Sequence, residues 1–320
     1  MSRIHEALKK AQEERSARQA SQSSGTPETP ALVPAAYTPA AVLETPELPP
    51  HRASVAEPIN ANDAPTFEMI LSQCRQRRWR INSSDPILGG KDEQLSNKEV
   101  FRTLRTKLYQ IRAAQPLRTV LVTSALPGEG KTFVTSNLAQ SLARQRERRT
   151  LLIDADLRLS NLHNSIGTES APGLSDYLLG EADEISVMQR GQDENLFLIA
   201  GGKSVANPTE LLANGKLGQL LDRMSVAFDW ILIDSPPVIP VSDANIVAKH
   251  CDGLLMIVRA GSTPYDLAQK ACESFPDRPL LGVVLNRTNA REGYGGYYYY
   301  GGYGPDPKKK NASLPAGPTA

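Results

Sequence analysis

A glycine-rich turn followed by lysine and threonine is the first feature of this sequence that could do chemistry. Residues 120–132 read VLVTSALPGEGKT, an apolar run that ends in this turn. Gly128 and Gly130 allow backbone N–H groups to curl around an anion, and the N-terminus of a following helix would add unpaired donors. Lys131 would then reach the β- and γ-phosphates of a nucleotide, and Thr132 would offer its hydroxyl to Mg²⁺. The turn therefore predicts a phosphate-binding loop that holds a nucleoside triphosphate.

The first position of this turn departs from the usual pattern. Phosphate-binding loops commonly read G-x-x-x-x-G-K-[ST], whereas this sequence has Ala125 at the first glycine. Taken alone, the turn could still be a chance glycine-rich segment. If it binds ATP, the contacts are expected from a continuous stretch: Pro127, Gly128, Glu129, Gly130, Lys131, Thr132 and Phe133.

Carboxylates follow two further apolar runs. Asp154 and Asp156 come after Leu-Leu-Ile, and Asp234 comes after Ile-Leu-Ile. A carboxylate that ends a buried strand is costly unless a positive group compensates it, and Mg²⁺ with bound phosphate would do so. A helix cap or a turn is the commoner reason for a single aspartate in such a place. Together with Lys131, however, the carboxylates predict a site for magnesium and a nucleotide.

These residues need a scaffold in which strand ends meet. Apolar runs rich in Val, Ile and Leu alternate with stretches of helical periodicity, the pattern of a parallel sheet covered on both faces. We expect an α/β fold of the P-loop NTPase type, with ligands at the carboxyl ends of the strands. Strands are predicted from residue 120 and at 150–153, 196–200, 230–233, 253–258 and 280–285, and helices at 99–112, 133–143, 207–224 and 242–249.

Composition excludes several classes of protein. The 320 residues carry a formal net charge of +1, whereas a protein that coats nucleic acid needs a large basic excess. Cys74, Cys251 and Cys272 form no C-x-x-C pattern, which favours a reducing compartment over a disulfide framework. No apolar stretch approaches the roughly 20 residues that span a bilayer, and the charged N-terminus lacks a signal-peptide core. We expect a cytoplasmic protein that binds no nucleic acid but could dock at a membrane.

The chain is expected to divide into four parts. Residues 1–18 are predicted to form a short amphipathic helix, which could bind a partner, lie on anionic lipid or remain solvated. Residues 19–84 are predicted to be a disordered linker rich in Pro and Ala, with a short helix near 67–80. The nucleotide-binding domain is expected at 85–290, followed by a flexible tail rich in tyrosine and glycine at 291–320.

The helix expected at 99–112 carries two patterns. Its predicted buried stripe is Val100, Leu104, Leu108 and Ile111. Glu99, Arg102 and Arg105 follow E-x-x-R-x-x-R spacing. Their ordinary role is surface ion pairing within the helix, worth only a few tenths of a kcal/mol.

A cluster of tyrosines marks the end of the chain. Six of the ten tyrosines lie among glycines at Tyr294, Tyr297, Tyr298, Tyr299, Tyr300 and Tyr303. Glycine keeps such a segment extended, so its hydroxyls could enter a neighbouring active site. A low-complexity tail without chemistry is the alternative. Beside a nucleotide site, we interpret these tyrosines as phosphate acceptors.

The combination of ALPGEGKT, LLIDADLR and ILIDSP resembles the bacterial tyrosine kinases of capsule and exopolysaccharide synthesis. The resemblance covers residues 86–303 and includes the segment NPTELL at 207–212 and the terminal tyrosines. In that family, Ser or Ala often replaces the first glycine of the loop. The opening MSRIHEALKKA and the Pro-rich linker resemble the subgroup associated with exosortase systems, which lacks a fused membrane half.

The resemblance implies an activity and roles for particular residues. It implies transfer of phosphate from ATP to the tail tyrosines of another copy, with Lys131 and the loop amides stabilising the γ-phosphate. Thr132, Asp154 and Asp234 would hold Mg²⁺ directly or through water. Asp154 would also accept the tyrosine proton or orient its hydroxyl, with Asp156 supporting the metal. Asn286 is implied to contact the base, although a structural turn is an equal interpretation.

The resemblance also implies partners. Glu99, Arg102 and Arg105 would assemble a ring-like homo-oligomer in which each tail feeds the next subunit. The activator would be a membrane protein that determines polysaccharide chain length, a co-polymerase, acting in trans and recruiting the kinase to the inner face of the membrane. The added charge of phosphotyrosine would then release the tail and destabilise the ring.

Two other functions remain compatible with the sequence. An ATPase of the partitioning or septum-positioning type shares this fold, but it typically carries a second lysine early in the loop and lacks a terminal tyrosine cluster. A catalytically silent scaffold that binds ATP and regulates a polymerase through assembly would use the same binding residues. External substrates, ring size and the polysaccharide are not indicated by the sequence.

Overall fold

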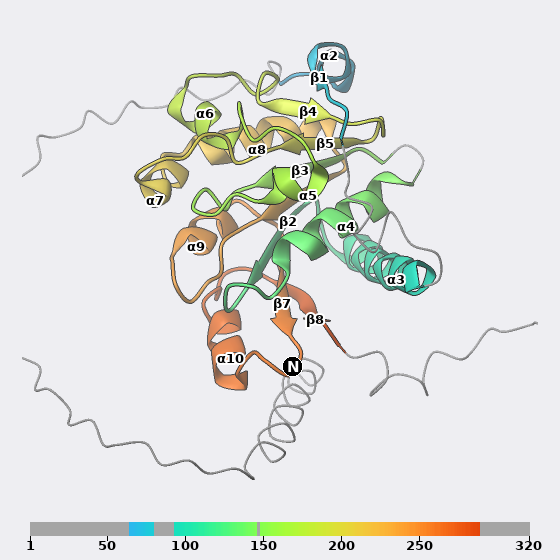
Figure 1. Ribbon diagram of the computed structural model, residues 1–320, viewed down its shortest axis with the longest axis vertical. Coiled ribbons are helices and arrows are strands. Elements are labelled where there is room, and N and C mark those ends of the chain that lie inside the picture. The colour runs from blue at the N-terminus through green and yellow to red at the C-terminus, as the bar shows by residue number, and fades with distance from the viewer. Residues whose placement is uncertain (1–63, 80–92, 146–147, 289–320) are drawn as a thin grey trace, which may run out of the picture. The chain divides into compact units, whose positions relative to one another are not determined.

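The computed structural model describes residues 64–79, 93–145 and 148–288. The predicted N-terminal helix, most of the predicted linker and all six tail tyrosines lie outside these residues. The described strands form one sheet in the order β1-β4-β5-β3-β6-β2-β7-β8 (Figure 1). Their bounds are β1 Arg75–Gln76, β2 Thr119–Ser124, β3 Thr150–Asp154, β4 Met188–Arg190, β5 Leu196–Ile199, β6 Trp230–Asp234, β7 Gly253–Arg259 and β8 Leu280–Asn286.

Neighbouring strands are parallel except for β4 and β5, so β1 and β4 run opposite to the other six strands. Within a strand, side chains alternate between the two faces. In β2, Val120 and Val122 pack on one face while Leu121 packs on the other, and all three are fully buried. This is why the strand reads as an unbroken apolar run, and it confirms the predicted mostly parallel sheet.

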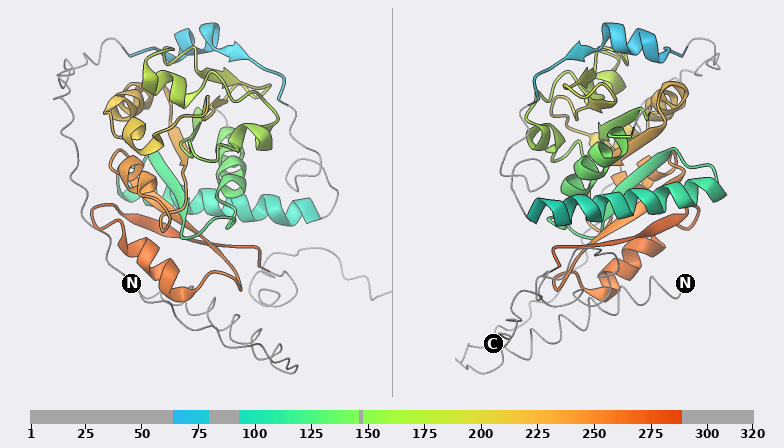
Figure 2. Two further views of the ribbon diagram at one scale, coloured as in Figure 1. Left: turned by 60° about the vertical axis from the view of Figure 1, so that its left-hand side comes forward. Right: turned by 90° about the vertical axis from the view of Figure 1, so that its right-hand side faces the viewer.

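Helices cover both faces of the sheet (Figure 2). α3 (Glu93–Ala114), α4 (Lys131–Ala143) and α5 (Leu162–Ile166) contribute to the core on one face. The helices of the other face are α2 (Phe67–Gln73), α6 (Leu174–Leu179), α7 (Pro208–Leu212), α8 (Lys216–Ala227), α9 (Asp243–Ala248) and α10 (Tyr265–Glu273). In the described part of the chain, no helix combines the length and apolar character needed to cross a membrane.

The helix predicted at 207–224 is two helices, α7 and α8, separated by a sharp turn. Gly215, which immediately precedes α8, has a φ of 84°, a left-handed conformation that favours glycine and interrupts the helix. The side chain of Asn214 accepts a hydrogen bond from the Lys216 N–H at 3.0 Å, which secures the start of α8. The Asn-Gly pair therefore interrupts a periodicity that otherwise continues across it.

The sheet extends further toward the N-terminus than the expected domain start at residue 85. β1 pairs with β4, and the preceding α2 buries Ile70 completely. Phe67 of α2 packs edge-on against Phe197 and Phe228, with ring centroids 5.6 and 6.3 Å away. Residues 67–76 thus belong to the packed domain, and α2 is shorter than the helix predicted near 67–80. β1 gave no sequence signal because both of its residues are polar and exposed.

The buried stripe of α3 differs from the prediction at one position. Val100 is 60% exposed, whereas Phe101 is 8% exposed and packs edge-on against Phe133 of α4. Leu108 is fully buried, and Leu104 and Ile111 are partly buried against the same core, as predicted. α3 therefore presents Phe101 rather than Val100, which fits the helical spacing of three and four residues equally well.

Candidate active site

Three neighbouring strands bring the predicted chemistry together at one end of the sheet. β2 lies beside β6, and β6 lies beside β3, all in parallel. Asp154 of β3 pairs in register with Asp234 of β6. α4 begins at Lys131, directly after Gly130, and the charge of Lys131 acts on Asp234. The lysine and two carboxylates of separate motifs therefore meet at the carboxyl ends of adjacent strands, the usual place for a ligand in such a sheet.

Glu129 supports the loop from inside the protein. Its side chain is buried, and Oε2 accepts a hydrogen bond from the Leu126 N–H at 2.8 Å. Oε1 accepts a hydrogen bond from the hydroxyl of Thr263, which itself accepts one from the Arg259 N–H at 3.0 Å. Both carboxylate oxygens of Glu129 are thus engaged within the protein. A contact from Glu129 to a nucleotide would come from its backbone.

Asn286 contacts the loop from the end of β8. Its Nδ2 donates a hydrogen bond to the Glu129 carbonyl at 2.8 Å. A Cβ at position 130 would lie 2.1 Å from that nitrogen, and Gly130 has a φ of 95°. Glycine is therefore required at position 130 by both space and conformation. The contact of Asn286 with a nucleotide base stays a prediction.

We predict that Thr263→Val weakens nucleotide binding without touching the nucleotide. Valine keeps the shape but leaves Glu129 Oε1 and the Arg259 N–H without their buried partner, at a cost of about 1–3 kcal/mol. Calorimetric titration should show ATP affinity falling several-fold, and thermal unfolding should show a lower Tm. Thr106→Val, which removes an exposed hydroxyl on α3, is the matched control. Unchanged affinity and Tm in Thr263→Val would contradict this supporting role.

Thr132 and Asp234 are already in contact. The Thr132 hydroxyl donates a hydrogen bond to Asp234 Oδ2 at 2.6 Å, and the Thr135 hydroxyl donates to Oδ1 at 3.3 Å. Asp234 is 1% exposed, and Lys131 is 8% exposed. Thr132 and Asp234 are the two oxygen groups that P-loop proteins use to hold Mg²⁺. The structure places these predicted metal ligands side by side.

Asp154 organises the loop that follows β3. Its Oδ1 accepts a hydrogen bond from the Asp156 N–H at 3.1 Å. Its Oδ2 accepts one from the Ser160 hydroxyl at 2.8 Å and one from the Leu162 N–H at 3.1 Å. Asp154 is fully buried, whereas Asp156 is partly exposed. In this conformation Asp154 therefore holds the loop, and a role toward a tyrosine hydroxyl stays a prediction.

The two buried carboxylates have perturbed acidity. Burial raises the pKa of Asp234, and the negative charge of Asp154 raises it further, while Thr132 and Lys131 lower it. Burial also raises the pKa of Asp154, against the hydrogen bonds from Ser160 and Leu162. Ionising both of these adjacent buried carboxylates therefore costs free energy, and a nearby cation would lower that cost.

Mg²⁺ fits these residues. It prefers oxygen ligands and is usually bound through one or two carboxylates together with substrate phosphates. Asp234, Asp154 and the Thr132 hydroxyl supply oxygen, beside a loop that is built for phosphate. In the described residues, no group of three or more His, Cys, Asp or Glu could hold a metal alone. The shell would therefore need the phosphates and water, as expected for a metal that enters with a nucleotide.

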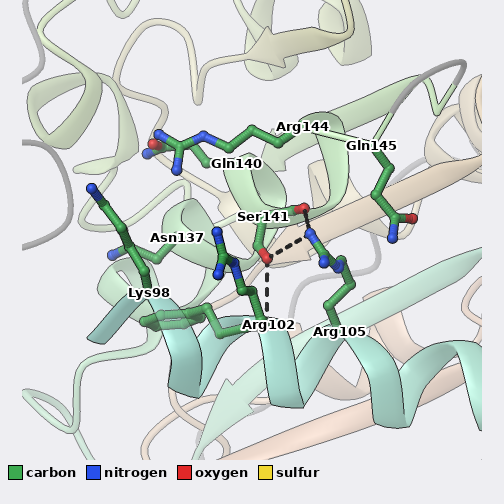
Figure 3. Close-up of a pocket in the computed structure, with 9 residues that line it drawn as sticks. Lys98, Arg102, Arg105, Asn137, Gln140, Ser141, Arg144 and Gln145 are labelled. Atoms are coloured by element: carbon green, nitrogen blue, oxygen red, sulfur yellow. Dashed lines mark hydrogen bonds between the residues drawn. The ribbon is translucent and has the colours of Figure 1, made fainter. Parts of the chain in front are cut away.

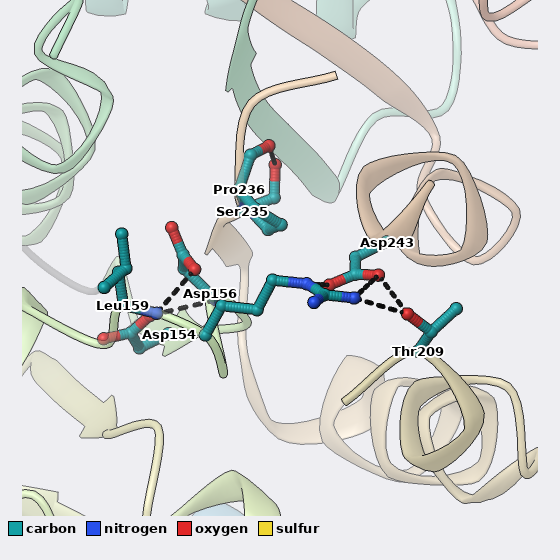
Figure 4. A network of polar contacts seen from close by, with 8 residues as sticks. Asp154, Asp156, Leu159, Thr209, Ser235, Pro236 and Asp243 are labelled. Atoms are coloured by element: carbon teal, nitrogen blue, oxygen red, sulfur yellow. Dashed lines mark hydrogen bonds and ion pairs between the residues drawn. The ribbon is translucent and has the colours of Figure 1, made fainter. Parts of the chain in front are cut away.

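A second polar network lies beside the carboxylates and was not predicted. Arg158 Nε donates to Asp243 Oδ2 at 2.7 Å, and Arg158 Nη2 donates to the Thr209 hydroxyl at 2.7 Å. Thr209 donates to Asp243 Oδ1 at 2.6 Å, and Figure 4 shows Thr209 and Asp243 together at one side of Asp154 and Asp156. Asp243 is fully buried. The network ties α7 and α9 to the loop after β3. The sequence LLIDADLR contains Arg158, but its partners are 51 and 85 residues away.

Of the three E-x-x-R-x-x-R residues, Glu99 and Arg102 lie on the surface, whereas Arg105 contacts α4. Arg102 pairs with Glu99 at 3.2 Å, and both side chains are more than 60% exposed. Arg105 instead turns toward α4, where Nη1 donates to the Ser141 carbonyl at 2.6 Å. The surface ion pair was therefore predicted correctly for Glu99 and Arg102. Arg105 holds α3 against α4, and a role of the three residues in assembly stays a prediction.

Comparisons with known proteins agree with this site. A family model described as an AAA domain matches residues 118–263. The tyrosine-protein kinase YwqD of Bacillus subtilis is 33% identical over 235 residues, which cover 73% of this chain and 97% of YwqD. The tyrosine-protein kinase wzc of Salmonella typhimurium is 35% identical over 205 residues, which cover 63% of this chain and 28% of wzc.

A solved structure supports the same assignment. The kinase domain of the Escherichia coli tyrosine kinase ETK is 31% identical, with a TM-score of 0.57 over 62% of this chain and 80% of that domain. The similarity thus includes sequence, fold and nearly the whole length of one relative. The chain belongs to the family of bacterial tyrosine-protein kinases.

Proposed function

We propose that this kinase transfers the γ-phosphate of ATP to the tyrosines at 294–303 of a second copy and thereby regulates exopolysaccharide synthesis and export. The observation that carries the proposal is the meeting of Lys131, Thr132, Asp154 and Asp234 at adjacent strand ends, where oxygen ligands and a phosphate loop lie together. In the transfer, the tyrosine oxygen forms a bond to phosphorus, the bond to the β-phosphate oxygen breaks, and ADP leaves. Mg²⁺ would neutralise the charge of the phosphates.

The residues of the chain would mainly position the reactants. The N–H groups of the loop and Lys131 bind the phosphates, and the packing of Glu129 and Asn286 keeps the loop in its binding shape. Thr132 and Asp234 would hold the metal. Asp154 accepts the phenolic proton or orients the hydroxyl after the loop at 155–162 adjusts, and Asp156 supports the metal. Asn286 contacts the base.

Among the alternatives, the autokinase agrees best with the family relationship. A partitioning or septum-positioning ATPase would not need the tyrosines at 294–303 and usually has a lysine in the part of the loop occupied here by Ala125, Leu126 and Pro127. A silent scaffold would bind ATP through the same residues without modifying the tail. The presence or absence of phosphate on the tail separates these functions.

The decisive experiment is mass spectrometry of the full chain after incubation with ATP and Mg²⁺. It should be run with and without the cytoplasmic piece of the membrane co-polymerase that we propose as activator. Phosphate at 294–303 in either sample supports the autokinase. A tail that stays unmodified in both samples while ATP binds would favour the scaffold or the plain ATPase.

We further propose that the kinase forms a ring-like homo-oligomer on the inner face of the membrane, through Glu99, Arg102 and Arg105. A double charge reversal, Arg102→Glu with Arg105→Glu, is expected to give monomers in sedimentation velocity. Because Arg105 also holds Ser141 of α4, the single change Arg102→Glu must be measured beside it. Circular dichroism controls for folding. Assembly that is unchanged in both variants would defeat the idea.

A further inference from the structure

A basic groove lies between α3 and α4, outside the carboxyl ends of the strands. Its volume is about 450 Å³, and its lining includes Lys98, Arg102, Arg105 and Arg144 but no acidic residue. Figure 3 shows Lys98 and Arg102 reaching from α3 toward α4, with Arg144 on the other wall. α4 itself contains no Asp or Glu to offset them. Such a concentration of positive charge favours an anionic ligand.

The contacts that these basic side chains already make show which of them can bind a ligand. Arg105 is engaged by the Ser141 carbonyl at 2.6 Å, so it belongs to the wall of the groove. Arg102 shares a pair with Glu99 at 3.2 Å, but its side chain is 62% exposed, and water screens such a pair so that it is weak. Arg144 is exposed at the end of α4. Arg102 and Arg144 can therefore turn toward a ligand at small cost, and the half-buried Lys98 adds its charge to the lining.

One apolar side chain, the largely buried Phe101, also lines the groove. Phe101 lines it between Lys98 and Arg102 and is held edge-on by Phe133. A ligand with an aromatic ring and a phosphate would place the ring near Phe101 and the phosphate among the guanidinium groups. Arginine binds phosphate oxygens in pairs of charge-assisted hydrogen bonds. Phosphotyrosine has this combination of ring and dianion.

We propose that the groove binds the phosphorylated tail of this chain, an inference that rests on the proposed function. The unmodified segment at 291–310 has two more basic than acidic residues, so the groove repels it. Each phosphotyrosine adds about −1.5 to −2 charges, so modification of a few tyrosines reverses the sign. The segment starts within a few residues of β8, and its tyrosines extend up to 17 residues beyond Asn286, a reach of about 55–60 Å when extended.

This binding would give phosphorylation a second effect. A tail held between α3 and α4 is removed from the active sites of neighbouring copies. It also covers Arg102, which we propose for assembly. Phosphorylation would then oppose assembly by occupying the groove, in addition to any repulsion at the active site.

The test uses a synthetic peptide of residues 291–304 with phosphate on Tyr298 and Tyr300 and a fluorescent label. Its anisotropy is followed during titration with the full chain carrying Lys131→Met, without ATP. The same titration is run with Arg102→Gln and Arg144→Gln added together, and with Lys270→Gln added as the control. Lys270 is an exposed lysine of α10, which packs on the other face of the sheet.

We expect the groove variant to bind at least about tenfold more weakly, because it loses two charge-assisted contacts, and the Lys270→Gln chain to bind as before. The unphosphorylated peptide should also bind at least about tenfold more weakly. Equal binding of the phosphopeptide to all chains, or equal binding of both peptides, would overturn the proposal. A third outcome would also overturn it: the phosphopeptide does not bind, but the full chain sediments with anionic vesicles and loses this when Arg102 and Arg144 are changed. Because the peptide is phosphorylated synthetically, the binding measurement can succeed or fail whether or not the chain phosphorylates its own tail.

Discussion

The chain carrying Lys131→Met is expected to lose essentially all phosphate from residues 294–303 after incubation with ATP and Mg²⁺. Lys131 is the cation of the loop, is 8% exposed and acts directly on Asp234. Methionine keeps much of its length but removes the charge that we propose stabilises the transferred phosphoryl group. The loss of such a group typically lowers a rate by about 10²–10³-fold or more. Quantitative mass spectrometry of the tail measures the effect.

Two further variants sharpen this experiment. Lys249→Met, at an exposed position next to α9, should retain the phosphate. Asp154→Asn should lose most of it while still binding ATP in calorimetry, because the change removes the proposed proton acceptor and metal ligand but no proposed phosphate contact. Full autophosphorylation of Asp154→Asn would contradict a role of Asp154 toward the tyrosine hydroxyl. If the Lys131→Met chain carries as much tail phosphate as the unchanged chain, the proposed site is wrong.

Asp234→Asn is expected to raise the Tm of the nucleotide-free chain while abolishing its stabilisation by Mg²⁺ and ADP. Burial and Asp154 raise the pKa of Asp234 to about 7. Ionisation of both carboxylates therefore destabilises the nucleotide-free fold, and this cost grows as the pH rises through 7. Removing one charge should raise the free energy of unfolding by on the order of 1–3 kcal/mol, or several °C in Tm. The gain is reduced by the hydrogen bonds from Thr132 and Thr135, since an amide has one acceptor oxygen.

The raised pKa of Asp234 also predicts how the gain in stability from Asp234→Asn changes with pH. The folded state binds the proton of Asp234 more tightly than the unfolded state does, so the free energy of unfolding falls as pH rises from about 4 to about 7. The gain from Asp234→Asn should therefore be small near pH 4 and largest above pH 7. Differential scanning calorimetry at both ends of this range measures it. Asp222→Asn, at an exposed carboxylate of α8, should change little. A lower Tm for Asp234→Asn at pH 7.5 would contradict the claim that the adjacent ionised carboxylates of Asp154 and Asp234 destabilise the fold.

The sequence was sufficient for the central part of the fold because buried parallel strands have a clear signature. The runs at β3, β5, β6, β7 and β8 contain consecutive apolar residues, and the structure places each within one or two residues of its predicted bounds. Asp154 and Asp234 were found for the same reason, since each ends such a run. Their meeting follows from the rule that parallel strands end at one edge.

Structural roles that depend on distant partners were not predicted. Thr263 and Glu129 are 134 residues apart, and only the folded chain brings them together. Asp243 likewise meets Arg158 across 85 residues. The start of the domain was missed because β1 has no apolar pattern, although Phe67 and Ile70 of α2 are part of the core. Local periodicity carries no information on such long-range contacts.

The position of β1 has a consequence for how copies of the kinase could be held. β1 and β8 are the two outer strands of the sheet, shown in blue and orange at opposite ends in Figure 1. Seven strand spacings of roughly 4.8 Å separate them by about 34 Å. A load applied through the residues before α2 would therefore enter at one outer strand. The chain leaves β8, toward the proposed acceptor segment, from the outer strand farthest from that load.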